Sequence, residues 1–438
     1  MFLVFGCNEE KEALHTGVDS TAPVEMISGM LSSSPSWTST EWGYSTGGAF
    51  ADINKDGLMD LVVAEGNDMA VGYVRVYLNR NGSLESTASW VSAIPHFYGH
   101  LAVGDVNGDN WVDVVVSRYI GDSGFSEPGG VEVFLNNSGE LSLHPDWEVD
   151  GLYSFSSALG DIDLDGDLDI GVAVGEAYYG DAAASVVFEN DGAGQFELMW
   201  QTGRTGYAYD VGWADMNSDG WLDLLLANQD IPHAIYFNQN GTLSSLPDWE
   251  ASGSGFEGNT LDFGDVNADG HLDLLVSDNN QMGGAGVVRI WCGPDFFMCW
   301  ESLDPPDMQS AVSFRDVDLD NDLDVIAGSW WGPVRIYRNE GGILATVPDW
   351  FSDIDDMVVE AFCWADLDCS HCEEYEISGH GLVSLPDRGF VVSVEGGVAQ
   401  DGYISGSQVS AIVRRSTAED LLVTDWESNH GNWLFPFE

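Results

Sequence analysis

The chain has 438 residues, of which 73 are Asp or Glu and 13 are Lys or Arg, so its formal net charge at pH 7 is -60. A chain this acidic repels nucleic-acid phosphates and anionic membrane surfaces, and we expect neither as a direct partner. The length exceeds that of a usual single domain, but a fold of repeated units can exceed it because each unit packs only on its neighbours.

The N-terminal residues 1–7 resemble the end of a bacterial lipoprotein signal. An apolar run leads to Cys7, which would carry the lipid after cleavage, although the basic region and most of the apolar region of such a signal are missing. The alternative is an accidental cysteine near the terminus. Residues 8–28 are polar and rich in Glu, Ser and Thr, and they predict a flexible tether. No later stretch reaches the roughly 18 apolar residues of a membrane span, so membrane contact is expected only through the lipid.

A nine-residue acidic loop recurs along the rest of the chain. In the first copy, Asp52, Asn54, Asp56 and Asp60 stand at loop positions 1, 3, 5 and 9, Gly57 stands at position 6, and an apolar strand follows. Alternate residues of a tight turn point to one side, so these oxygens can converge on a hard cation such as Ca²⁺, which takes roughly six to eight oxygen ligands. The Glu at position 12 and the helices of an EF-hand are missing. The pattern therefore predicts a calcium site between two strands.

The pattern returns in register. We number the copies loop 1 to loop 6 and call them the cation loops, after the ion that they are predicted to bind. Position 6 is Gly, or Asn in loops 2 and 6, and both residues tolerate a left-handed backbone. A solvated acidic turn without metal is the alternative, but repetition in register favours about six Ca²⁺ sites. The predicted ligands are Asp52, Asn54, Asp56 and Asp60; Asp105, Asn107, Asp109 and Asp113; Asp161, Asp163, Asp165 and Asp169; Asp215, Asn217, Asp219 and Asp223; Asp265, Asn267, Asp269 and Asp273; Asp316, Asp318, Asp320 and Asp324.

The spacing of the loops predicts an all-β fold. The first Asp of successive loops recurs every 50 to 56 residues, and a damaged seventh copy starts at Asp366. A period near fifty with short strands and no helical pattern is typical of four-stranded propeller blades. In the first unit we expect strands near residues 48–52, 60–64 and 73–78, and a fourth strand that ends at Trp90. Trp147, Trp249 and Trp350 end equivalent strands and are expected to pack between blades.

The two ends of the chain predict how the ring closes. The sequence from Gly29 to Trp37 resembles a fourth strand without a blade of its own. Residues 410–413, 420–423 and 432–437 resemble the first three strands of a last blade. We therefore expect a β-propeller over residues 29–438 with eight four-stranded blades, in which the N-terminal strand completes the last blade and removes an exposed edge. Seven blades with a C-terminal appendage is the competing count.

The damaged seventh loop has lost part of its ligand set. Asp366 and Asp368 remain, but positions 5, 6 and 9 are Ser370, His371 and Glu374. A disulfide between the flanking Cys369 and Cys372 would stiffen a loop that has lost its metal.

A zinc site is the alternative for this loop. Cys363, Cys369, His371 and Cys372 are of the residue types that bind zinc. Cys363, however, stands where other units have a small core residue such as Ala49. Elsewhere, Cys292 and Cys299 bracket a short turn and are expected to form a disulfide, in keeping with an oxidising compartment.

The loop pattern resembles a known family. The repeated Asp-x-Asn/Asp-x-Asp-Gly-x-x-Asp, which follows strands such as residues 48–51 and 101–104, resembles the FG-GAP repeat of integrin α-chain propellers and of bacterial VCBS-repeat surface proteins. The resemblance covers about residues 29–438. It implies a calcium-bearing propeller that serves adhesion or ligand binding outside the cell. Integrin α-chains have fewer calcium loops, so their partners are not expected to carry over.

The propeller geometry predicts where a ligand would bind. The cation loops share one face with the turns between strands 3 and 4, which leaves the opposite face free. Aromatic residues among Gly, Asn and Asp there would suit sugar rings, and packing between blades is the alternative for several of them. The candidate ligand residues are Phe97, Tyr98, Tyr119, Tyr178, Tyr179, Tyr207, Tyr209, Trp330 and Trp331.

Together these features favour a non-catalytic binding protein, stabilised by calcium and anchored by lipid at the cell surface. We expect a monomer that recognises an extracellular glycan or a surface protein. A polysaccharide lyase-like enzyme would need clustered proton-transfer and cationic groups. The candidates Arg118, Arg204 and His233 belong to different units. A passive scaffold within a surface assembly is the third alternative.

Overall fold

The computed structural model describes residues 37–353, 357–365 and 367, except Trp42 and Leu319. Beyond these it describes the backbone of eight strands between Cys372 and Phe435. Within the described residues, no helix is long and apolar enough to cross a membrane.

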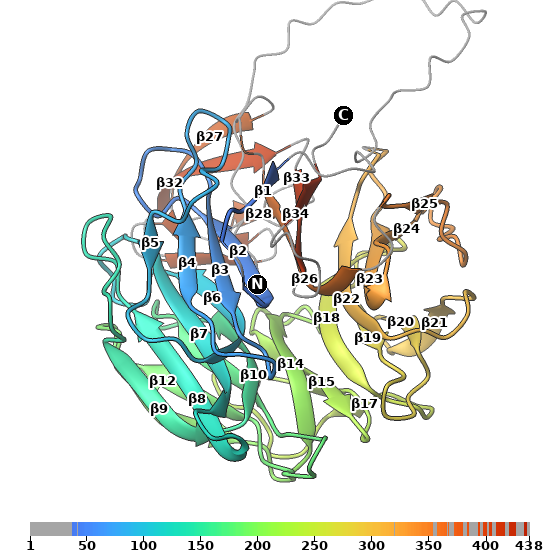
Figure 1. Ribbon diagram of the computed structural model, residues 1–438. Coiled ribbons are helices and arrows are strands. Elements are labelled where there is room, and N and C mark those ends of the chain that lie inside the picture. The colour runs from blue at the N-terminus through green and yellow to red at the C-terminus, as the bar shows by residue number, and fades with distance from the viewer. Residues whose placement is uncertain are drawn as a thin grey trace, which may run out of the picture.

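Six antiparallel blades, each built from four consecutive strands, lie around a common axis (Figure 1). Blade 1 consists of β2 (Ser45–Ala51), β3 (Asp60–Glu65), β4 (Val74–Tyr77) and β5 (Trp90–Val91). Blade 2 consists of β6 (Phe97–Gly104), β7 (Asp113–Gly121), β8 (Gly124–Phe134) and β9 (Trp147–Leu152). Blade 3 consists of β10 (Ser154–Gly160), β11 (Asp169–Val174), β12 (Val186–Asn190) and β13 (Phe196–Gln201). Blade 4 consists of β14 (Tyr207–Ala214), β15 (Asp223–Gln229), β16 (Ala234–Tyr236) and β17 (Trp249–Glu250). Blade 5 consists of β18 (Gly258–Gly264), β19 (Asp273–Asp278), β20 (Val287–Cys292) and β21 (Phe297–Glu301). Blade 6 consists of β22 (Gln309–Arg315), β23 (Asp324–Gly332), β24 (Arg335–Tyr337) and β25 (Trp350–Phe351).

The second strand of each blade is an apolar run because neighbouring blades cover both of its faces. In β3, Val62 and Ala64 face the core shared with blade 2, whereas Leu61 and Val63 face the core on the other side. Successive side chains of a strand point to opposite faces, so a strand covered on both sides needs no polar alternation. Burial of each Val or Leu side chain in such a strand contributes roughly 1.5–3 kcal/mol.

A tryptophan of the outer strand connects neighbouring blades. The indole Nε1 of Trp90 donates to Leu141 O of blade 2 at 2.9 Å, and that of Trp147 donates to Phe196 O of blade 3 at 3.2 Å. The expected packing of these two tryptophans between blades is therefore confirmed. Trp200 repeats the contact across the next boundary.

A terminal sheet joins strands from distant parts of the chain. It consists of β26 (Met357–Ala365), β33 (Asp420–Asp425), β34 (Trp433–Phe435) and β1 (Trp37–Thr38), hydrogen-bonded in that order. Phe362 of β26 packs in a core with blade 6, and Cys363 packs in a core with blade 1. The terminal sheet therefore lies between the sixth blade and the first.

The predicted blade count differs from the observed one. The structure describes six blades, not eight or seven. The expected first strand at residues 410–413 belongs to β32 (Val409–Ser416), which pairs with β27 (Cys372–Gly379) and not with β33. A further sheet follows β27, formed by β28 (Val383–Ser384), β29 (Ser393–Val394), β30 (Gly397–Gln400) and β31 (Tyr403–Ile404). These strands interrupt the repeat between β26 and β33, so strand-like residues could not be assigned to a sheet from the period alone.

Candidate functional site: the cation loops and the opposite face

Each cation loop connects the first and second strands of its blade. In loop 1, the carboxylate of Asp52 accepts hydrogen bonds from Asp56 N at 3.0 Å and Gly57 N at 2.9 Å. Asn54 Oδ1 also accepts from Asp56 N, at 2.8 Å. Lys55 has φ 55° and Gly57 has φ 88°, which is the left-handed turn expected for such a loop. The side chains at positions 1 and 3 are thereby drawn to the inside of the turn.

The Asp at position 9 is buried and also anchors the loop. Asp60 is fully buried, and its carboxylate accepts from Ile53 N at 3.1 Å and from Asn79 N at 2.7 Å. Burial raises the pKa of Asp60 to about 7, and these backbone hydrogen bonds oppose the shift. Burial raises the pKa of the equivalent Asp113 and Asp169 to about 7 as well. The sequence predicted these residues as ligands but not as anchors of the strand.

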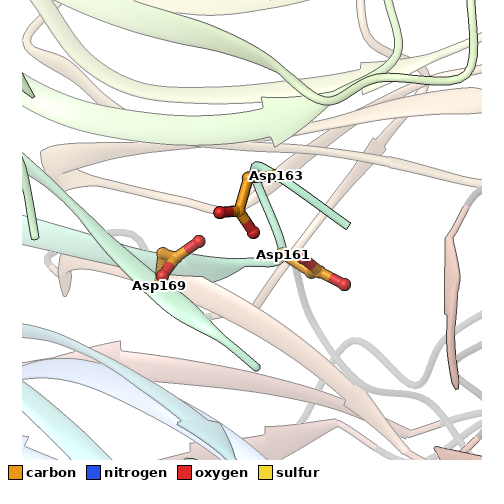
Figure 2. A group of neighbouring side chains, drawn as sticks. All are labelled: Asp161, Asp163 and Asp169. Carbon is orange, nitrogen blue, oxygen red and sulfur yellow. The ribbon is translucent and has the colours of Figure 1, made fainter. Parts of the chain in front are cut away.

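Three carboxylates meet in two of the loops. In loop 3, one oxygen of each of Asp161, Asp163 and Asp169 lies within 4.8 Å of the others (Figure 2). Asp316, Asp318 and Asp324 form the equivalent group in loop 6. The other four loops have Asn at position 3, whose amide oxygen is also a ligand for hard cations. These oxygen-only donor sets fit Ca²⁺, whose charge would offset the repulsion between buried carboxylates.

Two loops have a cationic neighbour. Arg80 Nη1 lies 3.9 Å from Asp56 Oδ2 in loop 1, and Arg338 Nη1 lies 3.9 Å from Asp318 Oδ2 in loop 6. Both distances are at the outer limit of an ion pair, and Arg80 is half-exposed, so each contact is weak.

Three of the candidate ligand residues on the opposite face are buried. Tyr98, Tyr119 and Tyr209 are 0, 1 and 3% exposed. The hydroxyls of Tyr119 and Tyr209 lie 2.6 Å apart, and Tyr98 donates to Glu132 Oε2 at 2.9 Å. The prediction that these tyrosines face a ligand is therefore wrong. Tyr119 of blade 2 and Tyr209 of blade 4 lie in one cluster with Phe155 of blade 3, and Tyr98 packs in the core shared by blades 1 and 2.

The other candidates remain at least partly accessible. Tyr179 is 72% exposed and Trp331 is 47% exposed, and both lie just beyond or at the end of a second strand. Tyr178 donates its hydroxyl to Gln281 Oε1 at 2.6 Å, and Phe125 lies 5.0 Å from the ring of Tyr179. The remaining candidates, Phe97, Tyr207 and Trp330, are half-buried.

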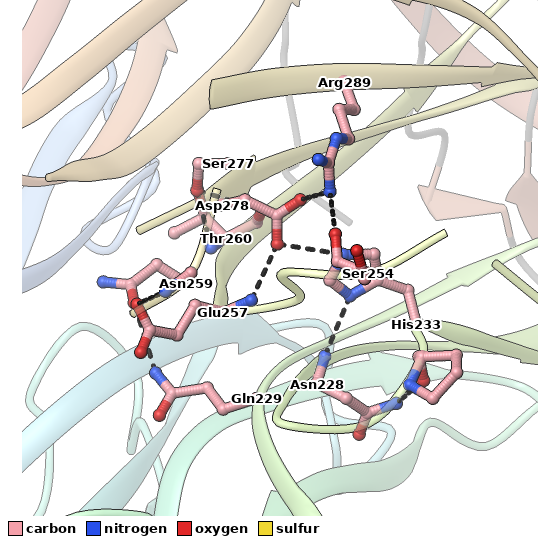
Figure 3. A network of polar contacts seen from close by, with 12 residues as sticks. Asn228, Gln229, His233, Ser254, Glu257, Asn259, Thr260, Ser277, Asp278 and Arg289 are labelled. Carbon is pink, nitrogen blue, oxygen red and sulfur yellow. Dashed lines mark hydrogen bonds and ion pairs between the residues drawn. The ribbon is translucent and has the colours of Figure 1, made fainter. Parts of the chain in front are cut away.

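A buried polar network connects blades 4 and 5 (Figure 3). Asp278 is fully buried and accepts from Arg289 Nη1 at 2.9 Å and from Glu257 N at 2.8 Å. His233 Nε2 lies 3.2 Å from Asp278 Oδ1, while His233 Nδ1 accepts from Asn228 N at 3.2 Å. The imidazole is therefore held as a structural group within the interface.

Arg118 and Arg204, the other cationic candidates, also have carboxylate partners. Arg118 Nε lies 3.2 Å from Glu132 Oε1, and its guanidinium also contacts Asp150. Arg204 forms an ion pair with Glu250 at 2.5 Å. Each arginine thus faces carboxylates of its own or the next blade.

The structure contains the expected disulfide between Cys292 and Cys299, with an S–S distance of 1.99 Å. Cys363 is buried in the core between the terminal sheet and blade 1, and burial raises the pKa of its thiol. Both properties disfavour it as a zinc ligand. Cys7, Asp366 and the side chains of Cys369, His371 and Cys372 lie outside the described residues.

The family model for the FG-GAP-like repeat matches residues 52–116 and 215–276, which include loops 1, 2, 4 and 5. This chain is a β-propeller that contains FG-GAP-like repeats. Two solved structures are similar to it in fold. The β-propeller domain of Cps50 (Swd1) from Myceliophteria thermophila has a TM-score of 0.54 at 9% identity, over 92% of this chain and 98% of that domain. BBS1N, solved in complex with ARL6DN, has a TM-score of 0.50 at 10% identity, over 88% of this chain and 97% of that chain.

These identities are low enough that the likeness concerns the fold alone. No curated protein matches the sequence. The FG-GAP match therefore identifies the repeat, and the function has to be inferred from the loops and the opposite face.

Proposed function

We propose that this FG-GAP propeller is a calcium-stabilised, non-catalytic binding protein that acts outside the cell or at its surface. The observation that carries the proposal is the convergence of carboxylate oxygens within 4.8 Å in loops 3 and 6, in a loop pattern that occurs six times. Carboxylates that lie close together without a cation repel one another, and a divalent cation is the ordinary means of offsetting this repulsion. Calcium would supply only charge neutralisation and cross-linking of each loop.

The ligand would bind on the face opposite the cation loops. Tyr179 and Trp331 are the exposed aromatic residues among the candidates there, and an exposed ring can stack on the C–H face of a sugar or on an apolar side chain of a protein. We infer a glycan or a surface protein as the partner and a monomeric binding unit.

A non-catalytic role is favoured by the state of the cationic candidates. His233 is buried against Asp278, and Arg118 and Arg204 are paired with carboxylates. A lyase needs a base and a cation that face the substrate together. An extracellular setting is supported by the Cys292–Cys299 disulfide, because such bonds persist in oxidising compartments. Lipidation of Cys7 would provide the anchor.

We further propose that β1 closes the ring. Trp37 Nε1 donates to Leu84 O of blade 1 at 3.1 Å, which is the contact that Trp90 makes with Leu141 O of blade 2. The register of β1 and β34 pairs Trp37 with Leu434. β1 would thus act as the outer strand of the terminal sheet.

A glycan array probed with the full chain tests the ligand proposal. It should be run in millimolar calcium and again in EDTA, with Tyr179→Ala as the site variant. Calcium-dependent binding that the variant loses would support a surface lectin. A blank array, followed by a blank pull-down from intact cell surfaces, would contradict a binding role.

A further inference from the structure

A buried asparagine connects each of several cation loops to the loop of the preceding blade. Asn136, between β8 and β9, is fully buried. Its backbone N–H donates to Asp113 Oδ1, at position 9 of loop 2, at 2.7 Å. Its Nδ2 donates to Ile53 O, at position 2 of loop 1, at 2.8 Å, and to Val112 O at 3.1 Å. All of these contacts are within ordinary hydrogen-bond range. Asn136 Oδ1 also accepts from Gly139 N at 2.8 Å, so the side chain joins the two loops and its own turn.

The same contact recurs at the next two boundaries. Asn190 Nδ2 donates to Val106 O of loop 2 at 2.8 Å, and Asn238 Nδ2 donates to Ile162 O of loop 3 at 2.7 Å. Both asparagines also donate their backbone N–H to the position 9 carboxylate of their own loop, at 2.9 and 2.8 Å. Loops 1, 2, 3 and 4 are therefore joined in sequence.

The contact links two ligand positions through a continuous hydrogen-bonded path. Ile53 N donates to Asp60 Oδ2 in loop 1, and Ile53 O accepts from Asn136, whose backbone N–H donates to Asp113 in loop 2. A cation that fixes the carboxylate of Asp60 would also fix Ile53, and through Asn136 it would lower the cost of ordering Asp113. Binding at one loop would then favour binding at the next, and linkage requires the effect to be mutual.

The path is interrupted between blades 4 and 5. Gly293 occupies the place of the asparagine in blade 5, and its N–H donates to Asp273 Oδ1 at 2.9 Å. Glycine has no side chain to reach Met216, the position 2 residue of loop 4. Among the hydrogen bonds of the described chain, none connects these two loops. The path resumes at the next boundary, where Asn339 Nδ2 donates to Val266 O of loop 5 at 2.7 Å.

We propose that the cation sites form two cooperative groups, loops 1 to 4 and loops 5 and 6, with Asn136, Asn190, Asn238 and Asn339 as the positioning residues that couple neighbouring sites. This inference rests on the proposed calcium binding. The sites within a group fill together, and the two groups fill independently.

The test is a calcium titration of the full chain followed by hydrogen exchange, read separately for the peptide that contains each loop. Asn136→Ala should raise the calcium concentration that protects loop 1 by about fivefold or more, since coupling free energies typically correspond to factors of about 5–150. Loops 5 and 6 should not change. Asn137→Ala is the matched control, because Asn137 is the adjacent exposed residue and its side chain donates to Leu135 O and Ser142 Oγ of its own turn.

A second variant tests the boundary without touching an asparagine. Asp265→Ala, which disables loop 5, should weaken loop 6 and leave loop 4 unchanged. An equal shift of all loops, or no shift of loop 1 in Asn136→Ala, would overturn the two-group arrangement while leaving calcium binding intact. If calcium protects no loop of the unaltered chain, the proposed calcium function itself is overturned, and the coupling of cation sites with it. In EDTA, Asn136→Ala should still speed exchange at Ile53, which reports the metal-free part of the path.

Discussion

At the scale of single residues, the carboxylates of a loop have two different roles. Asp165 at position 5 of loop 3 is exposed, whereas Asp169 at position 9 is buried and accepts hydrogen bonds from the backbone of Ile162 and Asn190. Asp165 accepts an exposed hydrogen bond from Asp167 N at 3.0 Å, which stays within its own loop. Asp169, in contrast, holds two strands together. Substitutions at the two positions should therefore have separable effects.

Asp165→Ala should weaken calcium binding at loop 3 and, through the coupling proposed above, at loops 1, 2 and 4, while loops 5 and 6 and the metal-free stability stay nearly unchanged. Asp169→Ala should weaken the same site and also destabilise the metal-free fold by roughly 2–4 kcal/mol, because two buried N–H groups lose their acceptor. Calorimetric titration and denaturant unfolding in EDTA measure the two effects. Global unfolding of Asp165→Ala would contradict the hypothesis that each loop is a local unit whose metal site can be lost without unfolding the propeller.

A second prediction concerns the tryptophans between blades. Trp90→Phe keeps most of the apolar surface but removes the N–H that donates to Leu141 O. The free energy of unfolding should fall by about 1 kcal/mol, the typical contribution of one such hydrogen bond. Trp331→Phe on the exposed face is the control and should have little effect on stability. Equal losses in both variants would argue against the hydrogen bond as the cause.

At the scale of strands and loops, the sequence predicted what is local. The spacing of Asp52, Asn54, Asp56 and Asp60 was sufficient to define a strand, a tight loop and a second strand, because the turn depends on residues within nine positions. The coupling role of Asn136 depends on a contact with another blade and could not be derived from one repeat. The sequence did contain a signal for this role. In several units Asn stands three residues before a Gly that precedes the fourth strand, as Asn136 does before Gly139.

The aromatic residues show the limit of inference from residue type. Tyr179 and Tyr209 both follow the pattern of exposed aromatics among small polar residues, yet one is 72% exposed and the other 3% exposed. The difference depends on other blades, because Phe155 of blade 3 and Tyr119 of blade 2 pack against Tyr209 of blade 4. Whether a propeller aromatic is accessible depends on a contact made some fifty or more residues away.

Alanine variants of these two tyrosines should therefore diverge. Tyr209→Ala should destabilise the fold by about 3–5 kcal/mol, as expected when a large buried ring is removed. Tyr179→Ala should leave the unfolding midpoint within about 0.5 kcal/mol of the parent chain and should reduce ligand binding. Denaturant unfolding and a binding assay on the same preparations separate the two. Intact ligand binding in Tyr179→Ala would remove this residue from the proposed site.

At the scale of the whole molecule, the N-terminal β1 and the C-terminal β34 pair in the terminal sheet. Only two residue pairs join β1 to β34, and Trp37 adds an indole hydrogen bond and a ring contact with Tyr77 in blade 1. The repeat period predicted an end-to-end arrangement of this kind but gave the wrong blade count, because the extra strands between β26 and β33 do not follow the period.

Trp37→Ala should lower the melting temperature of the whole propeller if β1 closes the ring. The loss should be at least as large as that of Trp90→Ala, because an interior blade retains its own chain connections on both sides. A differential scanning calorimetry trace recorded in EDTA measures this without interference from calcium. A melting temperature unchanged by Trp37→Ala would mean that β1 is dispensable for closure.

The measurement to make first is the thermal unfolding of the full chain in about 10 mM calcium and in EDTA, with the number of bound ions counted by calorimetry. With dissociation constants on the order of 10⁻⁴ to 10⁻³ M, as in extracellular calcium modules, each occupied loop should stabilise the fold by roughly 1.4–2.7 kcal/mol at that concentration. We predict about six ions, one for each intact loop, and a large fall in melting temperature on chelation. An identical melt in calcium and EDTA would contradict calcium as the element that stabilises this propeller.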